Sequence, residues 1–138
     1  MNFLNKKHIY LLHEQAIKKF GGFNGEYDYT DSKIESILAQ QYPCFGYEKY
    51  KTIFEKSAIL GYLFTKDHCF RDGNKRLGLY VIEVLLNINN LELTFNNEYA
   101  EILMNQIAAS RYRSKAIDKY IYELSNIIQN NSKPLTKF

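Results

Sequence analysis

The sequence predicts an all-α domain, a bundle of about six helices with one small β-hairpin. Nearly every segment carries apolar residues at steps of three and four, the period of a helix buried on one side. The 138 residues, 46% of them hydrophobic, suit one core, which we place at residues 1–129 ahead of a frayed tail at 130–138. No apolar run approaches the ~18 residues of a membrane span. The N-terminus does not resemble a signal peptide, so we expect a cytoplasmic protein.

The first two helices have recognisable ends. One helix is predicted over about residues 5–20, and the stretch GGFNG (21–25) ends it because glycine accepts the left-handed conformation found at helix ends. The next helix is predicted to begin near Ser32, which fits a capping box with Glu35, and to end before Pro43.

The segment 42-YPCFGYEKYKT-52 differs from the helices around it. Its aromatic residues nearly alternate around Gly46, which predicts an irregular loop or a short hairpin. A third helix is predicted from about residue 52 to 67, and a fourth from Gly73 or Asn74. The fourth is apolar on most sides, so we expect it to be the central helix.

The last third of the chain continues the helical pattern. Residues 87–97 interrupt the helical pattern, and we expect at most one short extended piece there. Two further helices are predicted at about 97–110 and 115–129. Cys44 and Cys69 form no CxxC pair, so we expect free thiols and no zinc site.

The charge is mildly basic. A net charge of +3 is well short of a nucleic-acid-binding arm, so a nucleic-acid partner is not favoured. From residue 111 onward, six basic residues stand against two acidic ones. We interpret this excess as a solvated helix face and tail, and the alternative is a surface for an acidic partner.

A dense set of reactive and charged residues, 68-HCFRDGNKR-76, lies where the fourth helix begins. The first N–H groups of a helix lack internal partners, and the helix dipole favours negative charge there. Gly73 leaves room for a bulky anion, and Asn74, Lys75 and Arg76 follow on the first turn. Free amides, a glycine and two cations together predict a phosphate-binding site.

The residues just before this helical turn suit a metal ion and a general base. Asp72 is an oxygen ligand suited to Mg²⁺, whose other ligands would be substrate phosphates. His68 suits a general base near neutral pH. Phe70 lies between His68 and Asp72 at alternate positions, so its ring can anchor the loop in the core while its two neighbours face the cleft. Each residue alone is better explained as a helix cap or a solvated charge, but together they predict transfer from a nucleotide to a hydroxyl group.

The sequence HCFRDGNKR is similar to the HxFx(D/E)GN(G/K)R signature of the Fic/Doc family. Lys75, where adenylyltransferases of this family have glycine, resembles the death-on-curing (Doc) branch. The likeness extends to GGFNG (21–25) and to the stretch from the second to the third helix, and it covers about residues 5–107. We therefore expect the Fic fold, with residues 42–52 as its flap.

The resemblance implies a role for each matching residue. His68 would be the catalytic base, Phe70 the loop anchor and Asp72 the magnesium ligand. The phosphates of ATP would bind Gly73, Asn74, Lys75 and Arg76. The flap would hold the target protein beside the site by strand addition, through Phe45, Gly46, Tyr47, Glu48, Lys49 and Tyr50.

Departures from the family pattern favour one activity over another. Adenylyltransferases of the family have a second arginine three residues after Arg76, and this chain has Leu79 there. Lys75 and Leu79 together resemble Doc, which binds ATP reversed and transfers its γ-phosphate. The resemblance thus predicts a kinase acting on a serine or threonine of a translation factor such as elongation factor Tu. AMP transfer is the alternative, and a catalytically inactive regulatory or binding module is the second alternative.

The resemblance also implies a partner. Fic proteins are often inhibited by a helix of their own with the pattern (S/T)xxxE(G/N). Thr94 and Glu98 have this spacing, but Tyr99 follows them, so we expect no internal inhibitor. Doc-like toxins are instead held by a separate antitoxin chain, whose disordered end folds as a helix across the active-site groove. We expect ATP and Mg²⁺ at the site, and an antitoxin and a target protein as partners.

Overall fold

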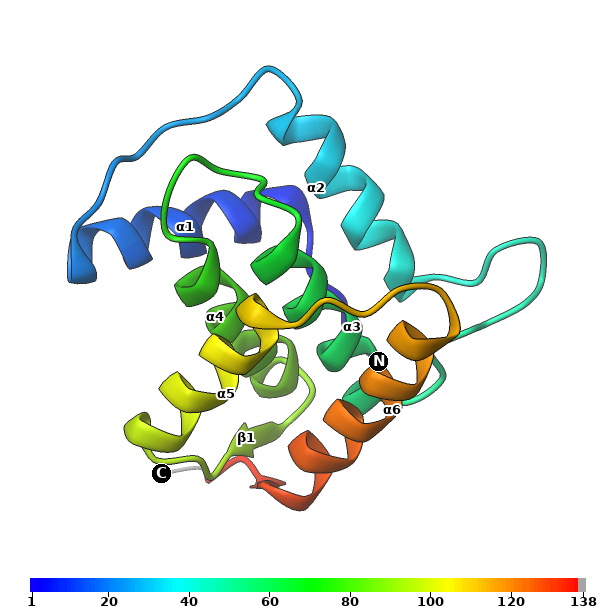
Figure 1. Cartoon of the computed structure of the whole chain (residues 1–138). Coiled ribbons are helices and arrows are strands. Elements are labelled where there is room, and N and C mark those ends of the chain that lie inside the picture. Colours follow the sequence, from blue (N-terminus) through cyan, green and yellow to red (C-terminus); the bar gives the residue numbers. More distant parts are fainter. Residues whose placement is uncertain (137–138) are drawn as a thin grey trace.

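The structure, a computed structural model, describes residues 1–136 and confirms the all-α fold class. Within these residues six α-helices follow one another (Figure 1): α1 Lys6–Phe20, α2 Thr30–Leu38, α3 Ile53–Lys66, α4 Asn74–Asn87, α5 Asn97–Ala109 and α6 Lys115–Asn130. A short 3-10 turn, η1 Ala39–Gln41, continues α2. None of the described helices is long and apolar enough to cross a membrane.

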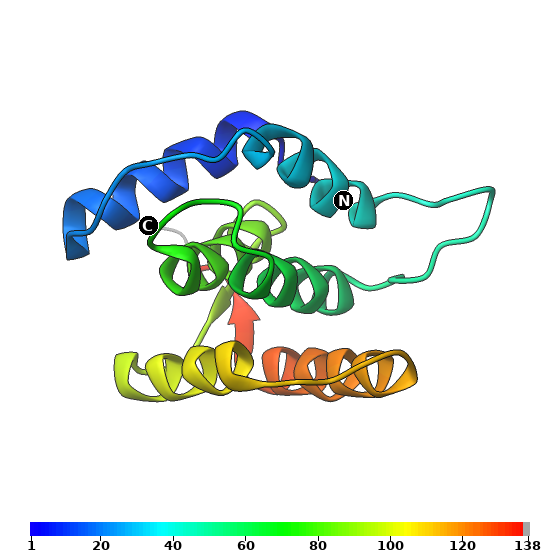
Figure 2. The same ribbon diagram turned by 45° about the horizontal axis from the view of Figure 1, so that its top comes forward.

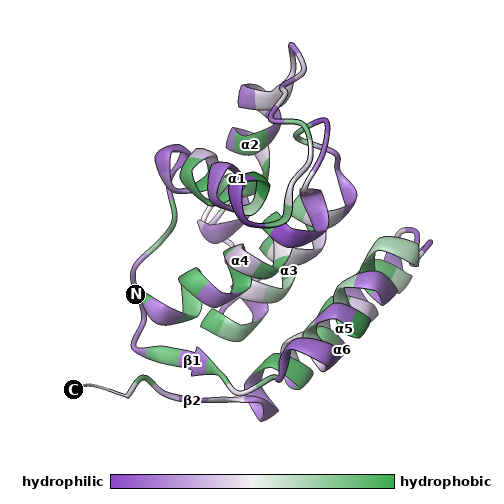
Figure 3. Cartoon of the chain, turned by 90° about the vertical axis from the view of Figure 1, so that its left-hand side faces the viewer, coloured by the Kyte–Doolittle hydropathy of each residue, from purple (hydrophilic) through white to green (hydrophobic). Residues whose placement is uncertain are grey.

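The helices form three layers, with α1 and α2 above, α3 and α4 in the middle, and α5 and α6 end to end below (Figure 2). The middle layer holds the core, where Phe64 of α3 and Leu77 and Leu85 of α4 have no exposed surface. The outer helices carry hydrophobic residues on part of their surface and hydrophilic residues on the rest (Figure 3), as helices that cover a core on one side do. This arrangement fixes the loop between α3 and α4 at one end of the central layer.

Helix α1 begins and ends as predicted, and α2 does not. The side chain of Asn5 accepts from the N–H of His8, and Gly21 ends α1 with a φ of +83°. The predicted capping box of Ser32 and Glu35 is wrong, because α2 begins at Thr30 and the Ser32 hydroxyl donates to the carbonyl of Tyr29.

The C-terminal segment is more ordered than predicted. Strand β1 (Leu91–Leu93) pairs antiparallel with strand β2 (Ser132–Pro134), so the prediction of a frayed tail is wrong for residues 132–134. A lone strand would leave backbone N–H and C=O groups without partners, and the tail supplies them. Two further backbone hydrogen bonds flank the pair, and residues 137–138 of the predicted tail lie outside the described residues.

The predicted hairpin is present in the flap, which we define as residues 42–52. Cys44 and Tyr47 exchange two backbone hydrogen bonds of 2.9 Å. Phe45 and Gly46 between them have φ angles of +51° and +76°, the pattern of a type I′ turn. Figures 1 and 2 show the flap projecting from the bundle near the start of α3.

Candidate active site

The segment 67–73, called the motif loop below, joins α3 to α4. His68 is exposed and has a left-handed φ of +48°, and its carbonyl accepts from the Tyr29 hydroxyl at 3.3 Å. The next carbonyl, that of Cys69, accepts from the hydroxyl of Thr30. The residues at the start of α2 therefore hold the backbone of the predicted base and of the residue that follows it.

The thiol of Cys69 is a structural group. The residue has no exposed surface, and burial raises the pKa of its thiol to about 12. A thiolate is the reactive form of cysteine, and burial suppresses it near neutral pH. Cys69 therefore has no part in the chemistry of its neighbour His68.

Phe70 anchors the motif loop in the core. Its ring is 1% exposed and stacks on the ring of His13, with centroids 3.7 Å apart and planes 6° apart. The side chain of Asn74 accepts from the Phe70 N–H at 3.2 Å and donates to its carbonyl at 2.9 Å. The Asn74 side chain therefore holds the loop, which leaves its backbone N–H for the predicted phosphate contact.

The carboxylate of Asp72 is oriented by backbone groups from two directions. One oxygen accepts from the Gly73 N–H at 2.9 Å, and the other accepts from the Phe23 N–H at 3.1 Å. Gly22, beside Phe23, has a φ of +111°, and a Cβ there would lie 2.6 Å from the Asp72 oxygen. The glycine-rich stretch after α1 thus allows the backbone to approach the carboxylate closely.

No motif or spacing in the sequence indicates that His13 belongs to the site. It lies on α1, is 1% exposed, and donates from Nε2 to the carbonyl of Asp72 at 2.7 Å. Because a carbonyl can only accept, Nε2 carries a hydrogen. His13 looked like one more residue on the buried face of α1, 59 positions away from Asp72. It touches both Phe70 and Asp72 and so links the anchor to the predicted metal ligand.

Asp72 fits the role of a magnesium ligand. Residues 1–136 contain no group of three or more histidine, cysteine, aspartate or glutamate side chains that could hold a metal. Mg²⁺ is often held by one or two carboxylates, with phosphate oxygens and water completing its shell. Each Asp72 oxygen accepts one hydrogen bond from the backbone and retains a lone pair for such an ion.

Helix α4 begins with the groups that suit a phosphate. Gly73 precedes the helix with a φ of +80°, and a Cβ there would lie 3.0 Å from Ile17. Lys75 and Arg76 follow, and both side chains are exposed. The positive end of the helix dipole and two cations therefore meet beside Asp72.

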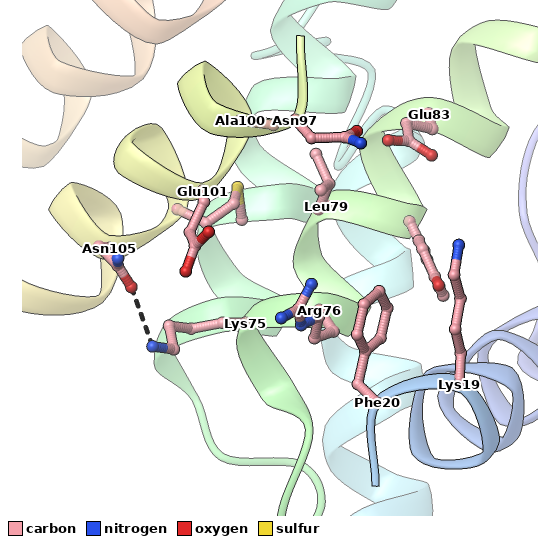
Figure 4. A pocket seen from close by; sticks show the side chains of 12 residues that line it. Lys19, Phe20, Lys75, Arg76, Leu79, Glu83, Asn97, Ala100, Glu101 and Asn105 are labelled. Atoms are coloured by element: carbon pink, nitrogen blue, oxygen red, sulfur yellow. Dashed lines mark hydrogen bonds between the residues drawn. The ribbon is translucent and has the colours of Figure 1, made fainter. Parts of the chain in front are cut away.

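Lys75 and Arg76 line a pocket between α1, α4 and α5 with a volume of about 520 Å³. Figure 4 shows Lys75 reaching toward Asn105, to which its amine donates at 2.9 Å, and Arg76 against the ring of Phe20. The Arg76 guanidinium lies 3.5 Å from that ring centroid, a cation–π contact. The apolar part of the lining comes from Leu79, Ala100 and Met104.

Two acidic side chains, Glu83 and Glu101, also line this pocket. Burial raises the pKa of Glu83, and the charge of Lys19 opposes that effect. The pocket thus combines cations near the helix start, an apolar wall and two acidic side chains. Ligand sites commonly have such a lining, in which a few polar groups are set among apolar ones.

The structure brings together the predicted residues of 68–76 but not the flap. The flap leaves the bundle at the start of α3, and His68 follows its end (Figure 1). At 1.5 Å per residue the 14 residues of α3 separate them by roughly 21 Å. Phe45 and Tyr47 of the flap are 104% and 67% exposed, and Lys49 pairs with Asp118 at 3.0 Å. The flap and His68 therefore lie at opposite ends of α3.

Comparison with known proteins decides the family. Residues 3–86, which include the whole motif loop and α1 to α4 up to its last turn, match the model of the Fic/DOC family. The chain belongs to the Fic/DOC family. It is also 30% identical over 90 residues to Toxin Doc of Mycolicibacterium smegmatis (strain ATCC 700084 / mc(2)155), an alignment that covers 62% of this chain and 69% of that protein. The predicted resemblance is confirmed, and α5 and α6 lie beyond the part that matches the Fic/DOC model.

Proposed function

We propose that this Fic/DOC protein is a Doc-like toxin that transfers the γ-phosphate of ATP to a serine or threonine hydroxyl. The target we propose is a translation factor such as elongation factor Tu, by analogy with the family. The relative named Toxin Doc supports the toxin assignment, and Lys75 and Leu79 support phosphate transfer over AMP transfer.

The position of the pocket is the observation that carries the choice of γ-phosphate. A triphosphate over the start of α4 has His68 on its α2 side and the α1–α4–α5 pocket on its other side. A nucleoside in this pocket leaves the γ-phosphate as the group nearest His68. The pocket is large enough for that, since ligand sites measure roughly 300–1,000 Å³.

AMP transfer requires the opposite orientation. The nucleoside would then lie on the α2 side of the motif loop, where a hollow of about 290 Å³ is lined by Tyr29, Lys33 and Asp67. That hollow is smaller than the α1–α4–α5 pocket. We therefore favour the orientation that presents the γ-phosphate.

Each residue of the motif loop has a part in this reaction. The His68 imidazole accepts the proton of the target hydroxyl, the hydroxyl oxygen bonds to the γ-phosphorus, and the bond to the β-phosphate oxygen breaks to release ADP. Lys75, Arg76 and the N–H groups of α4 offset the phosphate charge. Asp72 would hold Mg²⁺, which neutralises charge on the phosphates when bound.

The same pocket suits the proposed antitoxin. Phe20 on its α1 wall is 45% exposed, and Ala100 and Met104 of α5 add to the apolar lining. An antitoxin helix that covers these apolar groups would exclude the nucleoside. In this proposal the separate chain inhibits the toxin by competing with ATP.

Label transfer tests the activity. The protein and its His68→Ala variant are incubated with Mg²⁺, a bacterial lysate and ATP labelled at the α- or the γ-phosphate. We expect label from the γ-position only, reduced by about 10²–10⁴-fold in the variant with ATP affinity unchanged. Label from the α-position only would establish AMP transfer, and ATP binding without any transfer would favour a binding module.

A second experiment tests the orientation of the nucleotide. Ala100→Leu fills part of the pocket wall without touching the motif loop. We expect it to weaken binding of ATP but not of inorganic tripolyphosphate, which needs only the cations and the helix start. Equal weakening of both ligands, or of neither, would contradict a nucleoside in this pocket.

A further inference from the structure

The face of α4 that lines the α1–α4–α5 pocket changes in chemistry along its length. Four residues of this face recur at helical spacing: Arg76, Leu79, Tyr80 and Glu83. Arg76 lies in the first turn of α4, and Glu83 follows seven residues later, roughly 10 Å along the helix axis. Figure 4 shows Arg76 and Glu83 toward opposite ends of the pocket, with Leu79 between them. The pocket therefore has a cationic end, an apolar middle and a carboxylate end.

The carboxylate of Glu83 is an acceptor that the chain leaves open. Within residues 1–136 it forms no hydrogen bond and no ion pair. The side chain is half-buried, and burial raises the pKa of its carboxyl. The amine of Lys19 lies over the ring of Phe20, 5.3 Å from the ring centroid, and is not paired with this carboxylate. Polar groups withdrawn from water are normally paired, so a ligand with N–H donors would complete this end of the pocket.

The side chain of Asn97 lies at the same end. Asn97 is the first residue of α5, but its neighbour Asn96 caps the helix by accepting from the Tyr99 N–H at 2.7 Å. The Asn97 amide lines the pocket, and Figure 4 shows it on the side of Glu83 and away from Lys75. A primary amide both donates and accepts hydrogen bonds. This end of the pocket therefore offers a ligand a carboxylate and an amide together.

A carboxylate beside an amide matches one edge of adenine. An asparagine amide forms two hydrogen bonds with adenine, one from the N6 amino group and one to N7. The amino group has a second N–H, which remains for an acceptor such as Glu83. Guanine presents two acceptors, O6 and N7, at the same positions, and O6 would then face the carboxylate. The arrangement favours a purine with a 6-amino group over one with a 6-oxo group.

We propose that Glu83 and Asn97 recognise the 6-amino group of adenine at the end of the pocket opposite the phosphate-binding cations. Asn97 accepts one N–H of that group and donates to N7, and Glu83 accepts the other N–H. The apolar side chains between the two ends contact the base and ribose. This inference rests on the proposed function, because it assigns the nucleoside of that reaction to named side chains. Lys75 and Arg76 bind the phosphates of any nucleotide, so the choice among nucleotides lies with Glu83 and Asn97.

Three nucleotides test this recognition in the wild type. ATP, GTP and purine riboside triphosphate, which has the purine ring but no amino group, are compared by calorimetric titration with Mg²⁺ present. We expect ATP to bind about 10–100-fold more tightly than either of the others, the range for one hydrogen bond to a charged group. Inorganic tripolyphosphate, titrated in the same way, measures the phosphate contacts alone.

Variants assign the preference to particular side chains. Glu83→Met removes the acceptor at similar length, and we expect the ratio of ATP affinity to purine riboside triphosphate affinity to fall about tenfold. Asn97→Ala should lower this ratio by a smaller factor, because its amide is neutral and exposed. Glu101→Gln is the matched control, since it removes the other carboxylate of the lining, on the side of Lys75 in Figure 4, and should leave the ratio unchanged. Each variant should still bind tripolyphosphate, which shows that the cationic end is intact.

The outcomes separate this inference from the proposed function. Equal binding of ATP and purine riboside triphosphate by the wild type, or a ratio that Glu83→Met leaves unchanged, overturns the recognition, while transfer of the γ-phosphate is unaffected. GTP that binds as tightly as ATP, or an equal loss of the ratio in Glu101→Gln, also overturns it. ATP that binds no more tightly than tripolyphosphate defeats the placement of the nucleoside and this inference with it. A preserved preference for ATP without any label transfer supports the recognition and defeats the proposed reaction alone.

Discussion

The motif loop and the flap lie at opposite ends of α3 and are built in opposite ways. The motif loop is held from all sides: α1 through His13, α2 through Tyr29, and the glycine-rich stretch through Phe23. The flap is fixed at its base by Lys56 and by the exposed ion pair of Lys49 with Asp118, while Phe45 at its tip is fully exposed. A group that takes part in chemistry can lose about 10²-fold in rate when displaced by 1 Å, so dense support suits the motif loop. The tip of the flap has no comparable support.

The largest effect we predict follows substitution of Gly22, which lies against the motif loop. In Gly22→Ala the new Cβ would lie 2.6 Å from the Asp72 carboxylate, which must move away. We expect turnover to fall by about 10²-fold and Mg²⁺-dependent ATP binding to weaken, since Asp72 no longer faces the phosphates. Titration of ATP binding with Mg²⁺ and single-turnover phosphate transfer measure the two effects.

The neighbouring glycine is the matched control. Gly21 also has a positive φ, but no described atom lies within 4 Å of a Cβ placed there. Gly21→Ala therefore carries only the backbone strain, roughly 1–3 kcal/mol of unfolding free energy. An equal loss of turnover in both variants would mean that strain, and not contact with Asp72, causes the effect.

Replacement of His13 should have the second-largest effect on the motif loop. His13→Phe keeps a ring on Phe70 but leaves the partly buried Asp72 carbonyl without its donor, which costs about 1 kcal/mol. His13→Gln can keep the donor and loses the stacking. We expect both to lower the denaturation midpoint, and only His13→Phe to lower kcat at unchanged KM for ATP. Recovery of kcat in His13→Gln would assign the effect to the hydrogen bond.

Sequence reasoning found the part of the site that is contiguous and missed what the fold brings to it. The residues of 68–76 share one loop and one helix turn, so their proximity follows from their order. His13 and Lys56 were missed because each looks like an ordinary helix residue, and burial with a distant partner gives them their role. The pairing of the tail with residues 91–93 was missed for the same reason, since a three-residue strand has almost no pattern of its own.

Substitution at the tip of the flap should raise the free energy of unfolding, whereas the His13 substitutions lower it. Asparagine accepts the left-handed conformation, and Asn-Gly is the favoured pair for a type I′ turn. Phe45→Asn should therefore raise the free energy of unfolding by about 0.5–1 kcal/mol. A chemical denaturation curve measures this effect. A loss of stability would show that Phe45 packs on the chain itself.

The smallest effect we predict lies in the pocket, at Glu83. Burial raises the pKa of this carboxyl above its ordinary value of 4.5, so the folded state holds the proton more tightly than the unfolded state does. The ionised carboxylate therefore costs stability, and stability falls as the pH rises from about 4.5 through the raised pKa. Glu83→Gln removes this cost, and we expect a small rise in the thermal midpoint near neutral pH.

The pH dependence separates this electrostatic cost from a change in packing. At about pH 3.5 the carboxyl is protonated in both states, so wild type and Glu83→Gln should unfold at the same temperature. A difference that persists there would mean that the amide packs differently from the acid. If the difference appears only near neutral pH, the pocket carries a charge that destabilises the free protein. A ligand that offers Glu83 a hydrogen-bond donor would then recover that energy on binding, so ligand binding should raise the thermal midpoint more in the wild type than in Glu83→Gln.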